Sequence, residues 1–167
     1  MKDEFSLLPL RGERITQAFP LIREVAGDIT LERWQAYVAA LTYAAGQAEA
    51  ATGALAVQSP EGTIRGLASY RVALDLLHGR VLVVEQFVVS SRLYRRPVAT
   101  QLLEGLDELA RKLDCAAIHA TFPRKFRWLI DFFRRSHYGS GRCYMCKRLA
   151  ATTRKGWGGT TPRLVRG

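Results

Sequence analysis

The stretch VVSSRLYRRPVATQLL, residues 88–103, decides how the fold of this chain is interpreted. It begins with a β-branched segment, continues with arginines and a proline, and ends with a pair of leucines. This is the pattern of a strand followed directly by a helix. The first amides of a helix lack intrahelical partners and lie at the positive end of its dipole, so they bind anions. The stretch therefore predicts an anion-binding junction, and the alternative is a solvated basic turn.

Pro97 has a defined place in this junction. A proline is favoured at the first position of a helix because its fixed φ suits the helix, so we expect the helix to begin at Pro97. The guanidinium groups of Arg92, Arg95 and Arg96 would add charged hydrogen bonds to a phosphate. The backbone donors that remain for the same phosphate are the amides of Val98, Ala99 and Thr100.

Outward from this junction, hydrophobic periodicity divides the chain into strands and helices. Helices are expected over residues 13–27, 30–46, 98–113 and 125–136, and strands over 5–12, 53–58, 63–74, 80–90, 115–122 and 141–149. Pro20 predicts a kink or a late start in the first helix, and Thr30 is a candidate N-cap of the second. The unbroken apolar start of the fourth strand predicts that it is central and covered on both faces. The order β–α–α–β–β–β–α–β–α–β predicts an α+β chain whose central mixed, mostly antiparallel sheet carries helices on both faces.

The composition is that of a globular protein. The chain has 167 residues, of which 48% are hydrophobic and 24% are charged. We expect one domain, residues 1–150, followed by a basic Gly/Thr-rich tail, residues 151–167. No apolar run is long enough to cross a bilayer, and three cysteines provide no disulfide framework. A cytoplasmic protein without membrane contact is therefore expected.

Positive charge is concentrated in the second half of the chain. Residues 1–90 hold 8 Lys/Arg and 10 Asp/Glu, whereas residues 91–167 hold 17 and 5, which accounts for the net charge of +10. Such asymmetry indicates an anionic partner, which is nucleic acid, a membrane surface or a polyphosphate cofactor. Basic residues that only coat solvated helix faces would produce the same numbers.

The element order and the junction together resemble the GNAT (Gcn5-related) N-acetyltransferase superfamily, over roughly residues 5–149. The phosphate loop of that family reads Arg/Gln-x-x-Gly-x-Gly/Ala, between a strand that ends in an apolar triplet and a pair of leucines. The matching residues are Phe87–Val89 for the triplet, Leu102 and Leu103 for the leucines, and Ala99 for the last loop position. Tyr94 replaces the Arg/Gln and Pro97 replaces the first Gly, so the loop is degenerate.

The resemblance implies the acyl-CoA N-acyltransferase fold and an enzyme that transfers an acyl group from acetyl-CoA, or another acyl-CoA, to an amine. The pyrophosphate of coenzyme A would lie at the loop, and pantetheine would follow the central strand where that strand splays from its neighbour at a bulge. The residues implied in coenzyme A binding are Tyr94, Arg95, Arg96, Val98, Ala99 and Thr100, and the main chain of Phe87, Val88 and Val89. The acceptor is a small molecule or a peptide, which the sequence does not specify, and a homodimer is a further candidate partner.

Two side chains are candidates for the base that deprotonates the amine. Glu85 lies two residues before the triplet, where relatives often carry an acidic residue. The alternative for Glu85 is a strand-end carboxylate paired with Arg71 or Arg80. His119 lies in the strand beside the expected cleft and is a candidate base or relay, although the pattern favours a hydrogen-bonded core histidine.

The acid that protonates the leaving thiolate is less well defined. Many relatives carry a tyrosine in the last helix at the position that Phe133 occupies here, and Tyr138 is a substitute by proximity. The missing tyrosine and the altered loop favour an alternative function, a non-catalytic acyl-CoA-binding or regulatory module of the same fold. A basic nucleic-acid-binding protein is the second alternative. No metal site is expected, because the Cys143-x-x-Cys146 pair has no second pair at zinc-ligand spacing.

Overall fold

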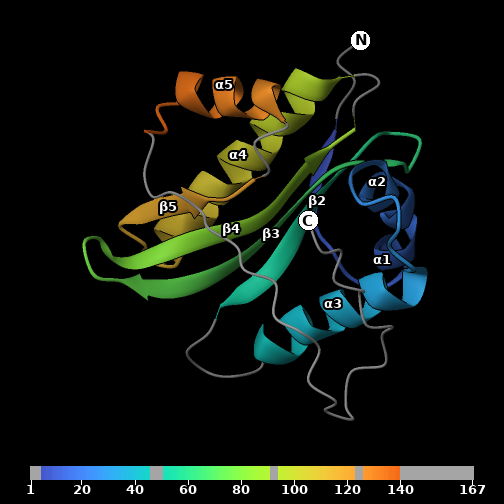
Figure 1. Ribbon diagram of the computed structural model, residues 1–167, viewed down its shortest axis with the longest axis horizontal. Helices are drawn as coiled ribbons and strands as arrows, with labels where there is room; N and C mark the ends of the chain where they lie inside the picture. Colours follow the sequence, from blue (N-terminus) through green and yellow to red (C-terminus); the bar gives the residue numbers. More distant parts are fainter. Residues whose placement is uncertain (1–4, 46–50, 91–93, 123–125, 140–167) are drawn as a thin grey trace, which may run out of the picture.

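The computed structural model describes residues 5–45, 51–90, 94–122 and 126–139 (Figure 1). The elements in chain order are β1 (Ser6–Pro9), α1 (Glu13–Gln17), α2 (Phe19–Val25), α3 (Leu31–Ala45), β2 (Thr52–Gln58), β3 (Ile64–Asp75), β4 (Gly79–Val89), α4 (Arg95–Lys112), β5 (Ala117–Ala120) and α5 (Arg127–Arg135). The expected strand at 141–149, the tail at 151–167 and Arg92 lie outside the described residues.

The sheet has the order β1-β2-β3-β4-β5, and its pairs are antiparallel except for the parallel pair β4–β5. The parallel pair follows from the crossover through α4, because parallel neighbours need a long connection. Helices α4 and α5 cover one face of the sheet, and α1, α2 and α3 lie on the other (Figure 1). The predicted α+β class, the mixed sheet and the helices on both faces are confirmed. None of the helices in the described ranges is long and apolar enough to cross a membrane.

Each face of the sheet has its own core, and β4 contributes to both. Leu82 and Val84 pack with the buried residues of α4 and α5, whereas Val88 packs with those of α2 and α3. This confirms that β4 is covered on both faces. Helix α4 lies close against β3, since a Cβ added to Gly66 would stand 2.5 Å from Val98 Cγ1.

Two helix boundaries depart from the expectations. The helix expected over 13–27 is divided into α1 and α2 at Ala18, because Pro20 in the first turn of α2 cannot donate back to α1. Helix α4 begins at Arg95, two residues before Pro97. The predicted N-cap of α3 is confirmed, since the amide of Arg33 donates to Thr30 Oγ1 at 3.2 Å.

A bulge in β4 separates two parts of this strand. Ser69 pairs with Gln86 and Tyr70 pairs with Val84, so Glu85 is an extra residue on β4. The ladder with β5 ends at the same place, with the pair Val84 and Ala120. Beyond the bulge β4 continues to Val89 beside β3 alone, as far as the described residues show.

Candidate functional site

The segment of β4 after the bulge presents a backbone edge that no described strand covers. The amide of Ser90 donates to Arg65 O at 2.9 Å, so the backbone of Ser90 faces β3. Because backbone direction alternates along a strand, Phe87 and Val89 direct their N–H and C=O groups away from β3. The main chain of Val88 faces β3 beside Leu67, so we correct the expected main-chain donors to Phe87 and Val89.

The start of α4 is built on Tyr94, which is left-handed with φ 61° and ψ 24°. The amide of Val98 donates to Tyr94 O at 3.0 Å, so Pro97 is the third residue of the helix rather than the first. The first amides of a helix have no intrahelical acceptor, and Pro97 therefore removes a donor that the helix does not use. Arg96 is the exposed residue whose amide lies in this first turn.

The three residues after Pro97 do not supply the free donors that the sequence suggested. Val98 and Ala99 are fully buried in the core, and the amides of residues 98–100 follow the first turn of α4, where intrahelical bonds begin. Thr100 is exposed in the second turn. The amides expected as anion donors at Val98, Ala99 and Thr100 therefore lie where the helix already supplies acceptors.

The side chains around this helix start are basic and aromatic. The Arg95 guanidinium lies over the Trp128 ring of α5, 4.7 Å from its centroid, which is a cation–π contact. Arg96 is exposed, and the first turn of α4 has no acidic residue. The Tyr94 ring meets Phe5 edge-on at 5.4 Å. The junction thus combines two guanidinium groups with the positive end of an 18-residue helix.

Glu85, the extra residue of the bulge, is held by an arginine on the neighbouring strand. Arg71 Nε donates to Glu85 Oε1 at 2.6 Å, and both side chains are partly exposed. Arg80, the other partner considered, instead donates to Leu113 O at 2.7 Å. Pairing does not remove Glu85 from the candidate base position, because its carboxylate still has a second oxygen.

Tyr37 and Ser69 are polar neighbours of Glu85 that the sequence reasoning did not select. The Tyr37 hydroxyl and Ser69 Oγ are 2.8 Å apart, and Ser69 is fully buried in β3. Burial, and then the charge of Glu85, raise the pKa of Tyr37, although the bond to Ser69 opposes the shift. The spacing of Tyr37 on an apolar helix face predicts a core residue, so only Ser69, a polar residue within the apolar run Leu67–Tyr70, could have indicated this pair.

His119 lies on the same face of the sheet as Glu85. Its neighbours Ile118 and Ala120 pack against the core beneath α4, so alternation places His119 on the opposite face. Its ring meets His78 edge-on, with centroids 5.3 Å apart. It makes no hydrogen bond to a described residue, so the structure of the described residues does not decide between a core histidine and a catalytic one.

Tyr138 lies on the other face, in the aromatic part of the core under α4 and α5. Its ring meets Phe133 at 4.8 Å, and Phe133 in turn meets Phe87 at 5.0 Å. The Tyr138 hydroxyl is buried without a hydrogen-bond partner among the described residues. Burial, and then the charge of Asp107, raise the pKa of this phenol. Glu85 and Tyr138 therefore lie on opposite sides of the open edge of β4.

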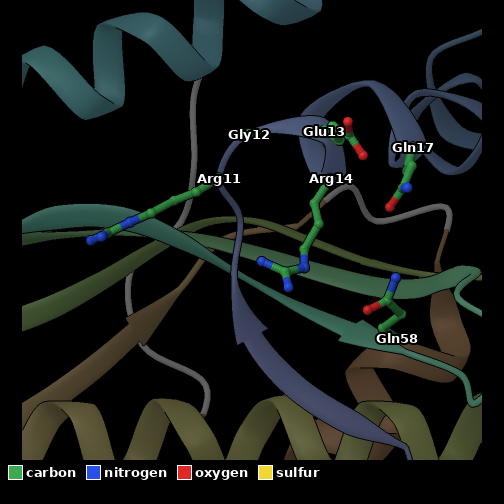
Figure 2. Close-up of a pocket in the computed structure, with 6 residues that line it drawn as sticks. All are labelled: Arg11, Gly12, Glu13, Arg14, Gln17 and Gln58. Carbon is green, nitrogen blue, oxygen red and sulfur yellow. The ribbon is translucent and has the colours of Figure 1, made fainter.

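A separate depression of about 360 Å³ lies beside α1 (Figure 2). Its lining residues are Arg11, Gly12, Glu13, Arg14, Gln17 and Gln58. Figure 2 shows them at the connection between β1 and α1, with Gln58 from β2 opposite. No predicted site residue lines this depression, and it is not part of the candidate site.

Comparison with solved structures identifies the fold that these features define. The aminoglycoside N-acetyltransferase AAC(6')-Iy in complex with CoA matches over 89% of this chain and 97% of its own, with TM-score 0.74 and 12% identity. Glucosamine-6-phosphate N-acetyltransferase from Arabidopsis thaliana matches over 87% and 98%, with TM-score 0.66 and 16% identity. A GNAT family acetyltransferase of Staphylococcus aureus matches over 87% and 98%, with TM-score 0.67 and 16% identity.

These matches establish the architecture of the chain, which is the GNAT fold across nearly all of its length. No protein-family model matches the sequence, and no curated protein matches it. The identities are too low to transfer a substrate. The matches therefore show the fold alone, and the activity has to be argued from the residues of this chain.

Proposed function

We propose that the chain is an N-acyltransferase that uses acetyl-CoA, or another acyl-CoA, to acylate an amine. The observation that carries the proposal is the open edge of β4 at Phe87 and Val89, which leads to the basic start of α4. An extended ligand can add to such an edge through main-chain hydrogen bonds. The complex of AAC(6')-Iy with CoA, and its complex with a CoA-containing bisubstrate analogue, support an acyl-CoA as the ligand.

Coenzyme A fits the two parts of this site by its chemistry. Its pyrophosphate would lie at the positive end of α4 and accept a hydrogen bond from the amide of Arg96, and its 3′-phosphate would pair with a guanidinium group. Its pantetheine carries amides that match the N–H and C=O groups of Phe87 and Val89, which no described strand covers. The arginines would thus replace the glycine-rich backbone that the loop lacks at Pro97.

In the proposed reaction Glu85 removes a proton from the attacking amine, directly or through a water molecule. The nitrogen attacks the thioester carbon, and the carbonyl oxygen takes the developing negative charge. An amide on the open edge of β4 would donate to that oxygen. The C–S bond then breaks, and the thiolate takes a proton, for which Tyr138 is the candidate donor. Arg71 positions the carboxylate of Glu85.

The proposal is tested by two measurements on the full chain. Coenzyme A should raise the melting temperature, and acetyl-CoA should release free thiol when an amine such as spermidine, a lysine peptide or an aminoglycoside is added. The matched reaction without amine is the control for simple hydrolysis. Absence of both stabilisation and thiol release would rule out the proposed function.

The second candidate is a non-catalytic acyl-CoA-binding module. The observation that favours it is Phe133, a buried residue without a hydroxyl. In the family that the sequence resembles, many members carry a proton-donating tyrosine at this position. Stabilisation by coenzyme A without thiol release from any amine would support this module. Salt-sensitive RNA binding without an effect of coenzyme A would instead support the nucleic-acid-binding alternative. A cytoplasmic location and a homodimer remain proposals, and light scattering tests the latter.

A further inference from the structure

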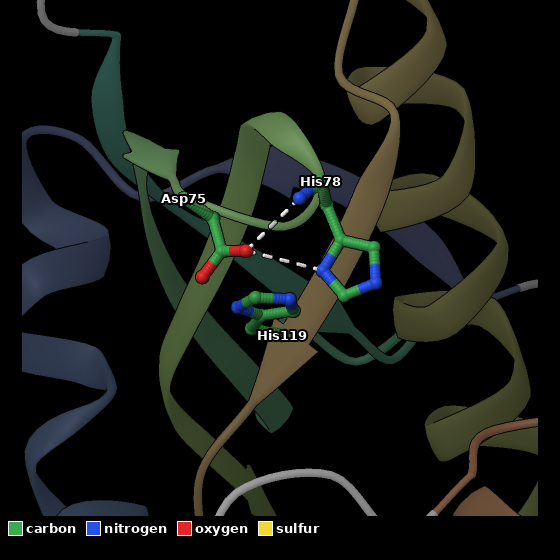
Figure 3. A group of neighbouring side chains, drawn as sticks. All are labelled: Asp75, His78 and His119. Atoms are coloured by element: carbon green, nitrogen blue, oxygen red, sulfur yellow. Dashed lines mark hydrogen bonds and ion pairs between the residues drawn. The ribbon is translucent and has the colours of Figure 1, made fainter.

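Three potential metal ligands meet at the hairpin between β3 and β4, away from the start of α4 (Figure 3). Asp75 is the last residue of β3, His78 lies in the turn that follows, and His119 comes from β5. One ligand atom of each residue lies within 4.8 Å of the others. Figure 3 shows the three side chains converging from these separate segments.

The turn holds the carboxylate of Asp75 in place. Asp75 Oδ1 accepts hydrogen bonds from the amides of Leu77 at 2.9 Å and His78 at 3.0 Å. His78 Nδ1 lies 3.2 Å from the same oxygen. The Asp75 side chain is only 6% exposed, whereas that of His78 is 52% exposed. The carboxylate is therefore preorganised at the bottom of the cluster, and an ion can approach from the side of His78.

We propose that Asp75, His78 and His119 bind one divalent transition-metal ion of the zinc class, with water completing the coordination. Two imidazoles and a carboxylate are ligands that Zn²⁺ prefers, and three protein ligands leave one tetrahedral position for water. Zinc–ligand bonds of about 2.0–2.2 Å place tetrahedral ligand atoms roughly 3.4 Å apart. The pair His78 Nδ1 and Asp75 Oδ1 already has nearly this separation, so side-chain rotation of His119 completes the site.

Binding requires a lone pair on each imidazole. The ring proton of His78 moves to Nε2, which leaves Nδ1 free for the metal. Neither ring nitrogen of His119 is engaged by a hydrogen bond to a described residue, so either can coordinate. The two rings pack edge-on with planes at 82°, and one nitrogen of each lies within 4.8 Å of the other and of an Asp75 oxygen.

The ion would connect the hairpin to the edge strand of the described sheet. The ladder between β4 and β5 consists only of Val81–Val84 with Ala117–Ala120. Asp75 and His78 precede β4 in the chain, at the hairpin end of this ladder, and His119 lies within the ladder on β5. A metal bound there stabilises the pairing of the two strands below the point where they part. We therefore assign it a structural role, separate from acyl transfer.

The test uses the full chain, freed of metal with a chelator and titrated with Co²⁺ and with Zn²⁺. We expect one equivalent of Co²⁺ to produce the visible absorption of a coordinated ion, and Zn²⁺ to displace it. Zn²⁺ should also raise the melting temperature, by about 5 °C at saturation. His78→Ala and His119→Ala should each weaken binding by about 100-fold or more, since even outer-shell changes weaken metal sites by about 10–100-fold.

Asp75→Asn is the informative variant for the carboxylate, because the asparagine oxygen still accepts the two amide bonds of the turn. It should weaken binding while circular dichroism and the melting temperature without metal stay unchanged. His78 is exposed, so His78→Ala decides the question even if His119→Ala fails to fold.

Two controls address the other metal-binding side chains. His137→Ala removes the remaining histidine of the sequence, and Cys143→Ser combined with Cys146→Ser removes the cysteine pair. Both should keep the Co²⁺ spectrum of the parent chain. Absence of binding to the parent chain, binding that survives His78→Ala, or binding lost with the cysteine pair would each overturn the proposal.

Discussion

At the scale of single residues, Glu85 is distinguished by its place in the bulge of β4. As the extra residue of that strand it lies at the end of the β4–β5 ladder and is paired with Arg71. An ordinary strand position would place a carboxylate in regular alternation with its neighbours. The bulge instead sets it beside the open edge where the acyl group is proposed to lie, as bulges next to active sites often do.

The first prediction concerns Glu85→Gln. We expect kcat to fall by about 100-fold or more, because a positioned general base contributes roughly 10²–10⁴-fold. Affinity for coenzyme A, measured by calorimetry, should not change, since the amide retains the shape of the side chain. Glu108→Gln, an exposed change of the same charge on α4, is the control. Equal kcat values in the parent and the Glu85 variant would dismiss Glu85 as the base.

Tyr138 allows a prediction about stability. Its pKa in the folded chain is raised by burial, so folding favours the neutral phenol. The stability that depends on this group is complete below the unfolded pKa of about 10 and is lost as pH rises through the higher folded pKa. Tyr138→Phe should therefore flatten the alkaline loss of stability, as measured by urea unfolding at pH values below and above about 10.

At neutral pH the same substitution also removes a buried hydroxyl without a partner in the described residues. We expect unchanged stability or a gain of about 1 kcal/mol, since an unsatisfied buried group costs about 1–3 kcal/mol. Tyr37→Phe is the contrasting variant, because it breaks the bond to Ser69 and should lower stability. A clear loss of stability in Tyr138→Phe at neutral pH would mean that its hydroxyl is bonded.

At the scale of elements, the start of α4 is expected to set the affinity for coenzyme A. Arg95→Ala combined with Arg96→Ala should weaken binding by at least about 10-fold, because a charged hydrogen bond contributes roughly 1.5–3 kcal/mol. Arg111→Ala combined with Lys112→Ala removes the same charge from the other end of the helix and should have little effect. Calorimetry that found equal affinities for both double variants would exclude α4 as the phosphate site.

Arg95 also packs on Trp128, so the two arginines are not equivalent. Arg96→Ala alone removes a charge and leaves the contact between α4 and α5 in place. The loss of coenzyme A affinity in Arg96→Ala, compared with the loss in the double variant, therefore measures the contribution of the Arg96 charge without a change in helix packing.

The contact between α4 and β3 leads to a further prediction at this scale. In Gly66→Val the new Cβ would meet Val98 Cγ1 at 2.5 Å and Leu102 Cδ1 at 3.0 Å, so α4 has to move away from the sheet. We expect the free energy of unfolding in urea to fall by about 1–3 kcal/mol, as for other overpacked cores. Gly27→Ala, where nothing lies within 4 Å of the added Cβ, is the matched control. Unchanged stability of the Gly66 variant would mean that α4 is not packed there.

The elements themselves could be predicted largely from the sequence, because apolar periodicity and turn residues mark them independently of the rest of the chain. The start of α4 could not. Proline is most common at the first helical position, but the left-handed Tyr94 turns the chain into the helix before Pro97. A positive φ at a residue other than glycine is uncommon, and nothing in the local pattern predicts it.

At the scale of the whole molecule, the fold followed from the order of elements, but the site did not. Tyr37 and Ser69 are 32 residues apart and come together only when α3 packs on the sheet. His119 joins Asp75 and His78 only through the parallel pairing of β5. Contacts of this kind depend on packing between distant segments, which a local pattern does not encode.

The expected division into residues 1–150 and a tail leads to the last prediction. A chain that ends at residue 150 should unfold cooperatively and should keep the increase in melting temperature that coenzyme A produces. The reason is that both parts of the proposed site lie within the first 100 residues. Loss of that response in the shortened chain, with the parent measured in parallel, would show that the tail contributes to the site.

The bulge at Glu85 also has a consequence for comparing or redesigning β4. Before it, even-numbered residues such as Leu82 and Val84 point toward α4, and after it odd-numbered residues such as Phe87 and Val89 do. The side chains that face α4 therefore switch from even-numbered to odd-numbered residues at Glu85. A regular strand that kept Glu85 but lost the bulge would invert every side chain downstream, exposing the aromatic ring at Phe87 and burying Gln86 in its place. Deletion of Glu85 itself would instead leave Phe87 and Val89 facing α4, because it restores regular alternation between Val84 and Gln86.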